Sequence, residues 1–196
     1  MMARLLDRLG RRSLLLAAVS ALVAFPASLA AQDAEQRAWQ VLASGGVVLF
    51  RHANAPGGGD PPNMRIGDCA SQRNLDDAGR AQAARIGDAF AQRSVRVGAV
   101  LVSQWCRTRE TAELAFPGRA SDEPAFNSFF SARSRGEAQT LAARRILAAW
   151  NGPEALVVVT HQVNITALTG IFPASGEGIV LQRRGGDWAV AGRIRP

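Results

Sequence analysis

The chain contains no lysine and no tyrosine, and it has only two histidines and two cysteines among its 196 residues. All of its basic charge apart from histidine is therefore arginine, and no basic block with interleaved aromatic residues indicates a nucleic-acid surface. The cysteine spacing does not suit a structural zinc site, which takes four ligands. What is present, 47% hydrophobic and 20% charged residues, predicts one ordinary globular domain that does not bind nucleic acid.

The N-terminal 30 residues have the pattern of a secretory signal peptide. An apolar run from Leu14 to Phe25 leads to the small-residue cleavage site Ser28-Leu29-Ala30 and follows four arginines: Arg4, Arg8, Arg11 and Arg12. The run is too short to span a bilayer as a mature helix. We therefore expect cleavage of residues 1–30, which leaves a single domain of residues 31–196 with no membrane span, exported to the periplasm or secreted. The alternative is an uncleaved membrane anchor.

Three short apolar runs each lead into polar residues that suit ligand binding. Arg51 and His52 follow the run Val47–Phe50, Arg107 follows Val97–Ser103, and His161 follows Ala155–Thr160. Runs this short and continuous suit strands that are buried on both faces. In open α/β sheets the carboxyl ends of such strands border the ligand crevice, so we expect these residues to face one site.

Helical patterns alternate with these strands along the chain. The expected helices cover residues 31–44, 75–90, 108–116, 137–150 and 162–168. A long loop of residues 53–74 follows the first strand, and residues 117–135 have no clear pattern. The alternation predicts an α/β fold, a three-layer sandwich with a mostly parallel central sheet flanked by helices, and residues 179–194 predict a C-terminal β-hairpin.

Two arginines and two histidines at one sheet edge predict a pocket for an anion. Guanidinium groups match phosphate oxygens, helix N-termini add backbone donors, and each charge-assisted hydrogen bond contributes roughly 1.5–3 kcal/mol. A metal site fits less well, because the arginines repel a cation. A neutral imidazole can instead attack phosphorus to form a phosphohistidine, which water then hydrolyses.

The same residues resemble the motifs of the histidine phosphatase superfamily, the phosphoglycerate-mutase-like fold, in its small exported branch. The family's strand-end Arg-His-Gly is similar to Arg51-His52-Ala53, and its second strand-end His-Gly is similar to His161-Gln162. Residues 75–83 resemble its Leu-Thr-x-x-Gly-x-x-Gln-Ala motif, and residues 103–112 resemble its Ser-Pro-Leu-x-Arg-Ala-x-Gln-Thr-Ala motif. The four matches stand in the family's order and cover most of residues 46–170.

The resemblance implies a phosphoric monoester hydrolase that needs no metal and no other cofactor. It implies that His52 is the phosphorylated nucleophile and that Arg51, Arg107 and His161 form the phosphate pocket. Arg109 is out of register for that role, and we expect it on the helix surface. Asn54 lies where the family often has a polar phosphate contact, although satisfying the loop backbone is an equal alternative. The remaining alternative is an unrelated α/β domain in which Arg51 and His52 merely end a strand.

The chain departs from the family pattern at the general acid. Many members carry a glutamate after the second motif, whereas residues 126–128 offer no carboxylate in that register. Three carboxylates are the main candidates for this role: Glu177, Asp60 and Glu123. Without an acid, the chain would act on phosphohistidine or an anhydride, or it would be a catalytically impaired phosphate-binding module of the same fold.

Both cysteines lie in the part of the chain that is expected to be exported. An oxidising compartment and an even count favour one disulfide between Cys69 and Cys106, and two unpaired buried thiols are the alternative. Such a bridge would tie the long loop to the turn that carries Arg107. The expected partner is a small phosphorylated substrate, and exported relatives in the family suggest a cell-envelope sugar phosphate.

Overall fold

The computed structural model describes residues 25–196, so most of the predicted signal peptide of residues 1–30 lies outside the described residues. The chain divides into two compact units, residues 1–34 and residues 35–196. Helix α1 (Phe25–Ala43) contains the described part of the first unit and the beginning of the second. None of the helices in the described residues is both long and apolar enough to cross a membrane.

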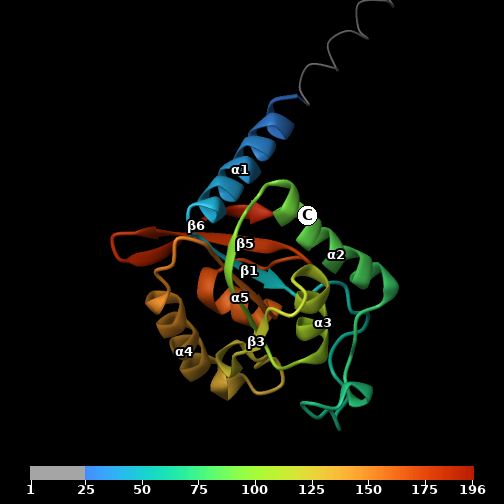
Figure 1. Ribbon diagram of the computed structural model, residues 1–196. Helices are drawn as coiled ribbons and strands as arrows, with labels where there is room; N and C mark the ends of the chain where they lie inside the picture. The colour runs from blue at the N-terminus through green and yellow to red at the C-terminus, as the bar shows by residue number, and fades with distance from the viewer. Residues whose placement is uncertain (1–24) are drawn as a thin grey trace, which may run out of the picture. The chain divides into compact units, whose positions relative to one another are not determined.

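The second unit contains one six-stranded sheet with the strand order β3-β2-β4-β1-β5-β6 (Figure 1). The strands are β1 (Val47–Arg51), β2 (Val97–Val102), β3 (Ala120–Asp122), β4 (Ala155–Thr160), β5 (Gly178–Arg184) and β6 (Asp187–Ile194). Strands β3, β2, β4 and β1 are mutually parallel, whereas β5 runs antiparallel to β1 and β6 antiparallel to β5. The predicted mostly parallel sheet and C-terminal hairpin are both confirmed, and the hairpin extends the same sheet.

Helices cover both faces of this sheet. Besides α1 they are α2 (Asp77–Gln92), α3 (Cys106–Ala115), α4 (Gly136–Ala149) and α5 (Gln162–Thr169). Side chains of β1 alternate between two apolar clusters: Val48 and Phe50 pack with residues of α1, α2 and α3, and Val47 and Leu49 pack with residues of α4 and α5. Because both faces of β1 are fully buried, its sequence reads as a continuous apolar run.

Helix α2 begins beside the loop that follows β1. The carboxylate of Asp76, the N-cap, accepts a hydrogen bond of 2.7 Å from the backbone N–H of Gly79. A Cβ atom at Gly79 would lie 2.1 Å from the carbonyl oxygen of Asn54, so only glycine allows this approach. The start of α2 is therefore fixed against the residues next to His52.

Residues 117–135, which had no clear sequence pattern, contain strand β3 and two 3₁₀ turns, Pro124–Phe126 and Arg133–Arg135. Strand β3 has only three residues, and it is held by parallel pairing with Val100 to Val102 at the edge of the sheet. Strand β3 was not predicted from the sequence, because a short, partly polar strand is defined by its neighbour and not by a local pattern.

Candidate active site

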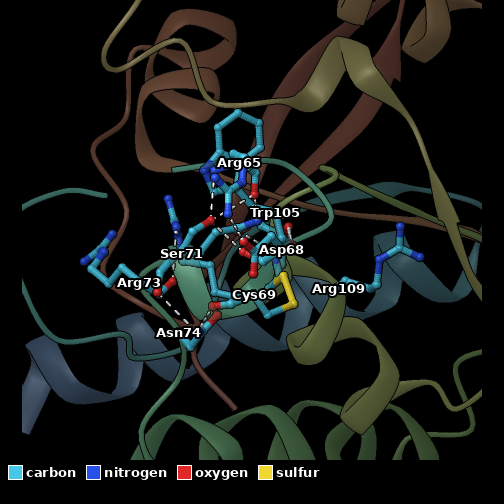
Figure 2. The surroundings of a disulfide bond; sticks show 12 residues. Arg65, Asp68, Cys69, Ser71, Arg73, Asn74, Trp105 and Arg109 are labelled. Carbon is cyan, nitrogen blue, oxygen red and sulfur yellow. Dashed lines mark hydrogen bonds and ion pairs between the residues drawn. A yellow bond between two sulfur atoms is a disulfide. The ribbon is translucent and has the colours of Figure 1, made fainter. Parts of the chain in front are cut away.

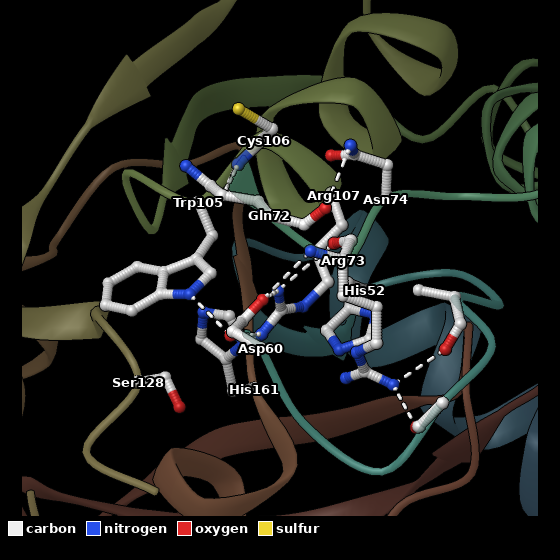
Figure 3. Close-up of polar contacts among 12 residues, drawn as sticks. His52, Asp60, Gln72, Arg73, Asn74, Trp105, Cys106, Arg107, Ser128 and His161 are labelled. Carbon is white, nitrogen blue, oxygen red and sulfur yellow. Dashed lines mark hydrogen bonds and ion pairs between the residues drawn. The ribbon is translucent and has the colours of Figure 1, made fainter. Parts of the chain in front are cut away.

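The carboxyl ends of three parallel strands meet at one cavity of about 540 Å³. Strand β1 leads from Arg51 into His52, helix α3 after β2 carries Arg107 near its start, and β4 leads into His161. Figure 3 shows His52, Arg107 and His161 beside one another. The predicted convergence of these four residues is confirmed, since all of them line the cavity. Its polar lining also includes Asp60 and Arg73, and the exposed rings of Phe130 and Phe172 line it as well.

His52 is buried and has one defined hydrogen-bond partner in its own loop. Its Nδ1 atom lies 2.8 Å from the carbonyl oxygen of Ala53. A carbonyl oxygen can only accept, so Nδ1 carries the proton and the lone pair resides on Nε2. Burial lowers the pKa of His52 to about 3, with a further lowering from Arg107 that outweighs the opposing effect of the Ala53 carbonyl. His52 is thus a neutral imidazole with a nucleophilic Nε2.

His161 lies against His52, with the ring centroids 5.5 Å apart, and both of its nitrogens have neighbours. Its Nε2 lies 2.8 Å from the Ser103 hydroxyl oxygen, and its Nδ1 lies 3.4 Å from Nη2 of Arg107. Guanidinium nitrogens only donate, so Nδ1 is the acceptor and Nε2–H donates to Ser103. Burial, followed by repulsion from His52 and Arg107, lowers the pKa of His161 well below its ordinary value.

Three arginines provide the positive charge of the cavity: Arg51, Arg73 and Arg107. The Nη1 of Arg51 donates to the carbonyl of Pro173 at 3.1 Å, whereas the Nε–H groups of all three are buried without a partner in the described residues. Burial, and then repulsion by Arg107, lowers the pKa of both Arg51 and Arg73. Unpaired buried donors and mutual repulsion are both relieved by a bound anion, so the cavity is built for one.

Asp60 occupies the guanidinium fork of Arg107. Its Oδ1 lies 2.6 Å from Nη1 and its Oδ2 lies 3.0 Å from Nη2, which is a bidentate pair. The indole N–H of Trp105 donates to Oδ2 at 3.0 Å, and the backbone N–H of Arg73 donates to Oδ1 at 3.2 Å. Burial alone would raise the pKa of Asp60, but these contacts, with Arg107 foremost, hold it below its ordinary value.

The other two candidate acids do not line the cavity, which corrects the expectation that either could serve. The carboxylate of Glu177 is buried, and it accepts hydrogen bonds from Arg193, Arg195 and the backbone N–H of Ala174. Glu123 caps a 3₁₀ turn by accepting from the N–H of Ala125 at 3.0 Å. Both carboxylates are satisfied structurally, and pairing of β5 with β6 brings the arginines to Glu177.

Asn54 is also placed away from the cavity. Its side-chain amide donates to Asp76 at 2.8 Å, and its backbone N–H donates to the side-chain oxygen of Gln82 at 3.0 Å. The expected substrate contact is therefore not supported, and Asn54 links the loop after β1 to helix α2. Arg109 pairs with Asp122 outside the cavity, so its predicted place on the helix surface is confirmed.

The predicted disulfide is confirmed. Cys69 and Cys106 are bonded, with their Cα atoms 5.6 Å apart, and the bond joins the long loop to the first residue of α3 (Figure 2). A second link lies beside it, because the side-chain oxygen of Gln72 accepts a hydrogen bond of 2.9 Å from the backbone N–H of Cys106. Both links fix the loop next to Arg107.

Four residues that contribute to the site were not predicted for it: Arg73, Ser103, Trp105 and Asn127. Ser103 stands inside a motif that the sequence analysis quoted, which was a usable signal. Arg73 carried none, because arginine is common in this chain and Arg73 stands in the irregular loop. Asn127 is 24 residues away from Ser103 along the chain, and only folding brings its amide oxygen to the serine hydroxyl.

Comparison with known proteins supports the same family. Residues 47–127 match the sequence model of the histidine phosphatase superfamily (branch 1), whereas no curated protein matches the chain significantly. A candidate phosphohistidine phosphatase, SixA, of Agrobacterium tumefaciens is 25% identical, with a TM-score of 0.52 over 78% of this chain and 99% of that chain.

Two further solved structures are similar in fold. A mycobacterial glucosyl-3-phosphoglycerate phosphatase is 15% identical, with a TM-score of 0.54 over 74% of this chain and 96% of that chain. The protein histidine phosphatase SixA complexed with tungstate is 16% identical, with a TM-score of 0.51 over 77% of this chain and 97% of that chain. The matched segment contains Arg51, His52 and Arg107, and over these residues the chain is similar to the histidine phosphatase superfamily.

Proposed function

We propose that this chain is a metal-independent phosphatase that hydrolyses a phosphomonoester, or a phosphohistidine or phosphoanhydride, through a phosphohistidine on His52. The observation that carries the proposal is the state of His52, a neutral imidazole whose Nε2 lone pair is free beside three arginines. A weakly basic, buried imidazole remains unprotonated at neutral pH and can attack phosphorus directly.

In the first step Nε2 of His52 attacks the phosphorus atom and the bond to the leaving group breaks. Charge spreads over the three equatorial oxygens of a loose transition state. Arg51 and Arg107 donate to these oxygens, and His161 adds a donor once it takes up a proton at Nδ1. The bound phosphate promotes that uptake, because a nearby negative charge raises the pKa of an imidazole.

In the second step water attacks the phosphohistidine and releases inorganic phosphate, which regenerates His52. The arginines stabilise the same oxygens again, since the geometry of attack is similar from either side. No step of this scheme calls for a metal or an organic cofactor.

The lining of the cavity suggests the kind of group that carries the phosphate. The exposed rings of Phe130 and Phe172, together with Met64, line the same cavity as the three arginines. Aromatic rings can pack against a sugar ring or an imidazole. Two of the similar structures, a candidate phosphohistidine phosphatase and a glucosyl-3-phosphoglycerate phosphatase, are named for the same two classes. We propose a substrate from one of these two classes. If residues 1–30 are a signal peptide and the chain is exported, a cell-envelope sugar phosphate is the substrate that we propose.

An impaired binding module is the second candidate, and one observation favours it. Asp60 fills the fork of Arg107, so in the described arrangement a phosphate would be held by Arg51 and Arg73 without the Arg107 donors that the reaction requires. Such a module would bind phosphate and hydrolyse nothing.

A rapid-quench experiment with radiolabelled substrates tests the proposal. The panel should contain phosphohistidine, a sugar phosphate, a simple alkyl phosphate and pyrophosphate. We expect acid-labile label on His52 and a loss of roughly 10³-fold or more in kcat for His52→Asn. Asp68→Asn serves as the control, because Asp68 pairs with Arg65 on the surface at 2.7 Å. Normal turnover by His52→Asn would refute the mechanism, and phosphate binding without turnover would favour the binding module.

A further inference from the structure

Asp60 is the only residue with a carboxyl group among the described residues that line the cavity. The same lining contains no cysteine, and the chain has no tyrosine or lysine. The two histidines already have proposed roles: His52 is the nucleophile, and His161 donates a hydrogen bond to the phosphate. A proton for an alcohol leaving group must therefore come from Asp60 or from water.

In the described arrangement the Asp60 carboxylate occupies the Arg107 position that a phosphate would need. Its two oxygens receive both Nη groups of Arg107, and Trp105 and the Arg73 backbone complete its hydrogen bonds. One guanidinium fork cannot hold a carboxylate and a phosphate in the same positions. A phosphate that binds Arg107 must displace Asp60 by a few ångströms, to a place beside the oxygens it has replaced.

The chain before Asp60 permits such a movement. Gly57, Gly58 and Gly59 precede it, and Gly57 has a φ of +106°, a conformation that glycine adopts without strain. Around Gly58 and Gly59 there is open space, with no atom within 4 Å of a Cβ position. On the other side the disulfide holds the loop. The glycine segment can thus act as a hinge while the rest of the loop stays fixed.

We propose that substrate phosphate displaces Asp60 from Arg107 and that the displaced carboxyl group is the general acid for the leaving group. This inference rests on the proposed phosphatase function and names its missing acid.

The exchange of partners also supplies the proton affinity that an acid needs. While Arg107 is its partner, Asp60 stays ionised. After displacement Asp60 loses that cation and lies beside a dianion, and both changes raise its pKa. Four other charged or titratable groups line the cavity and act on it as well: Arg51, Arg73, His52 and His161. The arginines oppose the rise, but the phosphate neutralises them in the same complex.

The steps balance. The lone pair of His52 Nε2 forms the N–P bond, the P–O bond breaks, and the leaving oxygen takes the proton of the Asp60 carboxyl group. Water then attacks phosphorus and gives a proton to the Asp60 carboxylate, while the electron pair of the P–N bond returns to His52. One water is consumed, and one alcohol and one inorganic phosphate are released. Asp60 loses its proton when phosphate leaves and Arg107 becomes available again.

Two leaving groups separate acid catalysis from other roles of Asp60. The alcohol of an alkyl phosphate needs a proton on its departing oxygen, whereas p-nitrophenolate leaves p-nitrophenyl phosphate as a stable anion without one. We expect Asp60→Asn to lower kcat by about 10²- to 10⁴-fold on the alkyl phosphate and by less than about tenfold on p-nitrophenyl phosphate. The control Asp68→Asn should match the unmodified protein on both. Equal losses on the two substrates would overturn the assignment of Asp60 as the acid.

Binding of inorganic phosphate tests the displacement by itself, without any turnover. Calorimetry should show at least about tenfold tighter phosphate binding to Asp60→Ala, because the competing carboxylate is gone and the competent state is fully populated. Thermal unfolding with and without phosphate verifies that the variant is folded. Weaker binding by folded Asp60→Ala would overturn the displacement. If the unmodified protein turns over no substrate but Asp60→Ala binds phosphate more tightly, the proposed function and the acid role fail and the displacement stands.

Discussion

The Nε2 atom of His161 lies 2.8 Å from the hydroxyl oxygen of Ser103, and this contact determines which nitrogen of His161 faces the phosphate pocket. The Ser103 hydroxyl is itself 3.3 Å from the amide oxygen of Asn127, an acceptor that also receives the backbone N–H of Gln104 at 2.8 Å. Ser103 therefore donates to Asn127 and accepts from Nε2–H. The Nδ1 atom therefore points toward Arg107. In the proposed mechanism, a proton taken up there on substrate binding would face the phosphate.

Removing the Ser103 hydroxyl should misorient His161. We expect Ser103→Ala to lower kcat by roughly 10- to 100-fold, a range typical of groups that orient a functional imidazole. Because the effect acts through the protonation of His161, the pH profile of kcat should shift as well, and Ser103→Thr should restore much of the rate. Steady-state kinetics from pH 5 to 9 measure both. An Ala variant with the rate and profile of the unmodified protein would contradict the role.

Glu177 should control stability at acid pH. Burial raises its pKa, but hydrogen bonds from Arg193, the Ala174 N–H and Arg195 outweigh this and lower the pKa to about 2. The pKa of Glu177 is near 4.5 in the unfolded chain and about 2 in the folded protein, so the ionised carboxylate stabilises the folded state fully at pH values above 4.5. This contribution is lost as the pH falls from 4.5 to about 2.

The substitution Glu177→Gln tests this window. We expect a loss of about 1–3 kcal/mol at pH 7, since the arginine partners are partly exposed and screened. The loss should shrink below pH 4.5, because the unmodified protein loses the same interaction there. Denaturant unfolding at several pH values measures it, with Glu123→Gln as the control carboxylate outside this cluster. A pH-independent difference would argue against the linkage.

The disulfide should affect substrate affinity through the loop that carries Asp60 and Arg73. It encloses a sequence separation of 37 residues, for which loss of the cross-link costs about 3–4 kcal/mol of unfolding free energy by the chain-entropy model. We expect reduction to raise KM several-fold while the core sheet keeps the protein folded. A Cys69→Ser, Cys106→Ser double variant provides the same comparison without free thiols. Unchanged kinetics after confirmed reduction would rule this out.

The strand-end positions of His52 and His161 could be read from the sequence because the pattern is local. Residues 47–50 and 155–160 are continuous apolar runs, and the structure buries both on each face of the sheet. The N-cap at Asp76 was legible for the same reason, since capping involves residues three apart. The disulfide was predictable because the chain offers only one pairing of its two cysteines.

The roles of the carboxylates could not be predicted from their neighbours in the sequence. Glu177, Asp60 and Glu123 were equivalent as sequence positions, and their functions differ because of partners that are distant in the chain. Glu177 is held by arginines 16 and 18 residues later, through the hairpin, whereas Asp60 meets Arg107 47 residues later, across the cavity. The expected substrate contact of Asn54 lacks support for the same reason, because its partner Asp76 caps the next helix.

The sequence by itself determined the main strands and helices, the residues at the strand ends and the resemblance to the histidine phosphatase superfamily, because periodicity and short motifs are properties of neighbouring residues. Only the tertiary structure decided which carboxyl group lines the cavity, which nitrogen of each histidine carries the proton, and that Arg73 joins the cavity lining. Those outcomes depend on distances between side chains that folding brings together, and on the burial that shifts their pKa values.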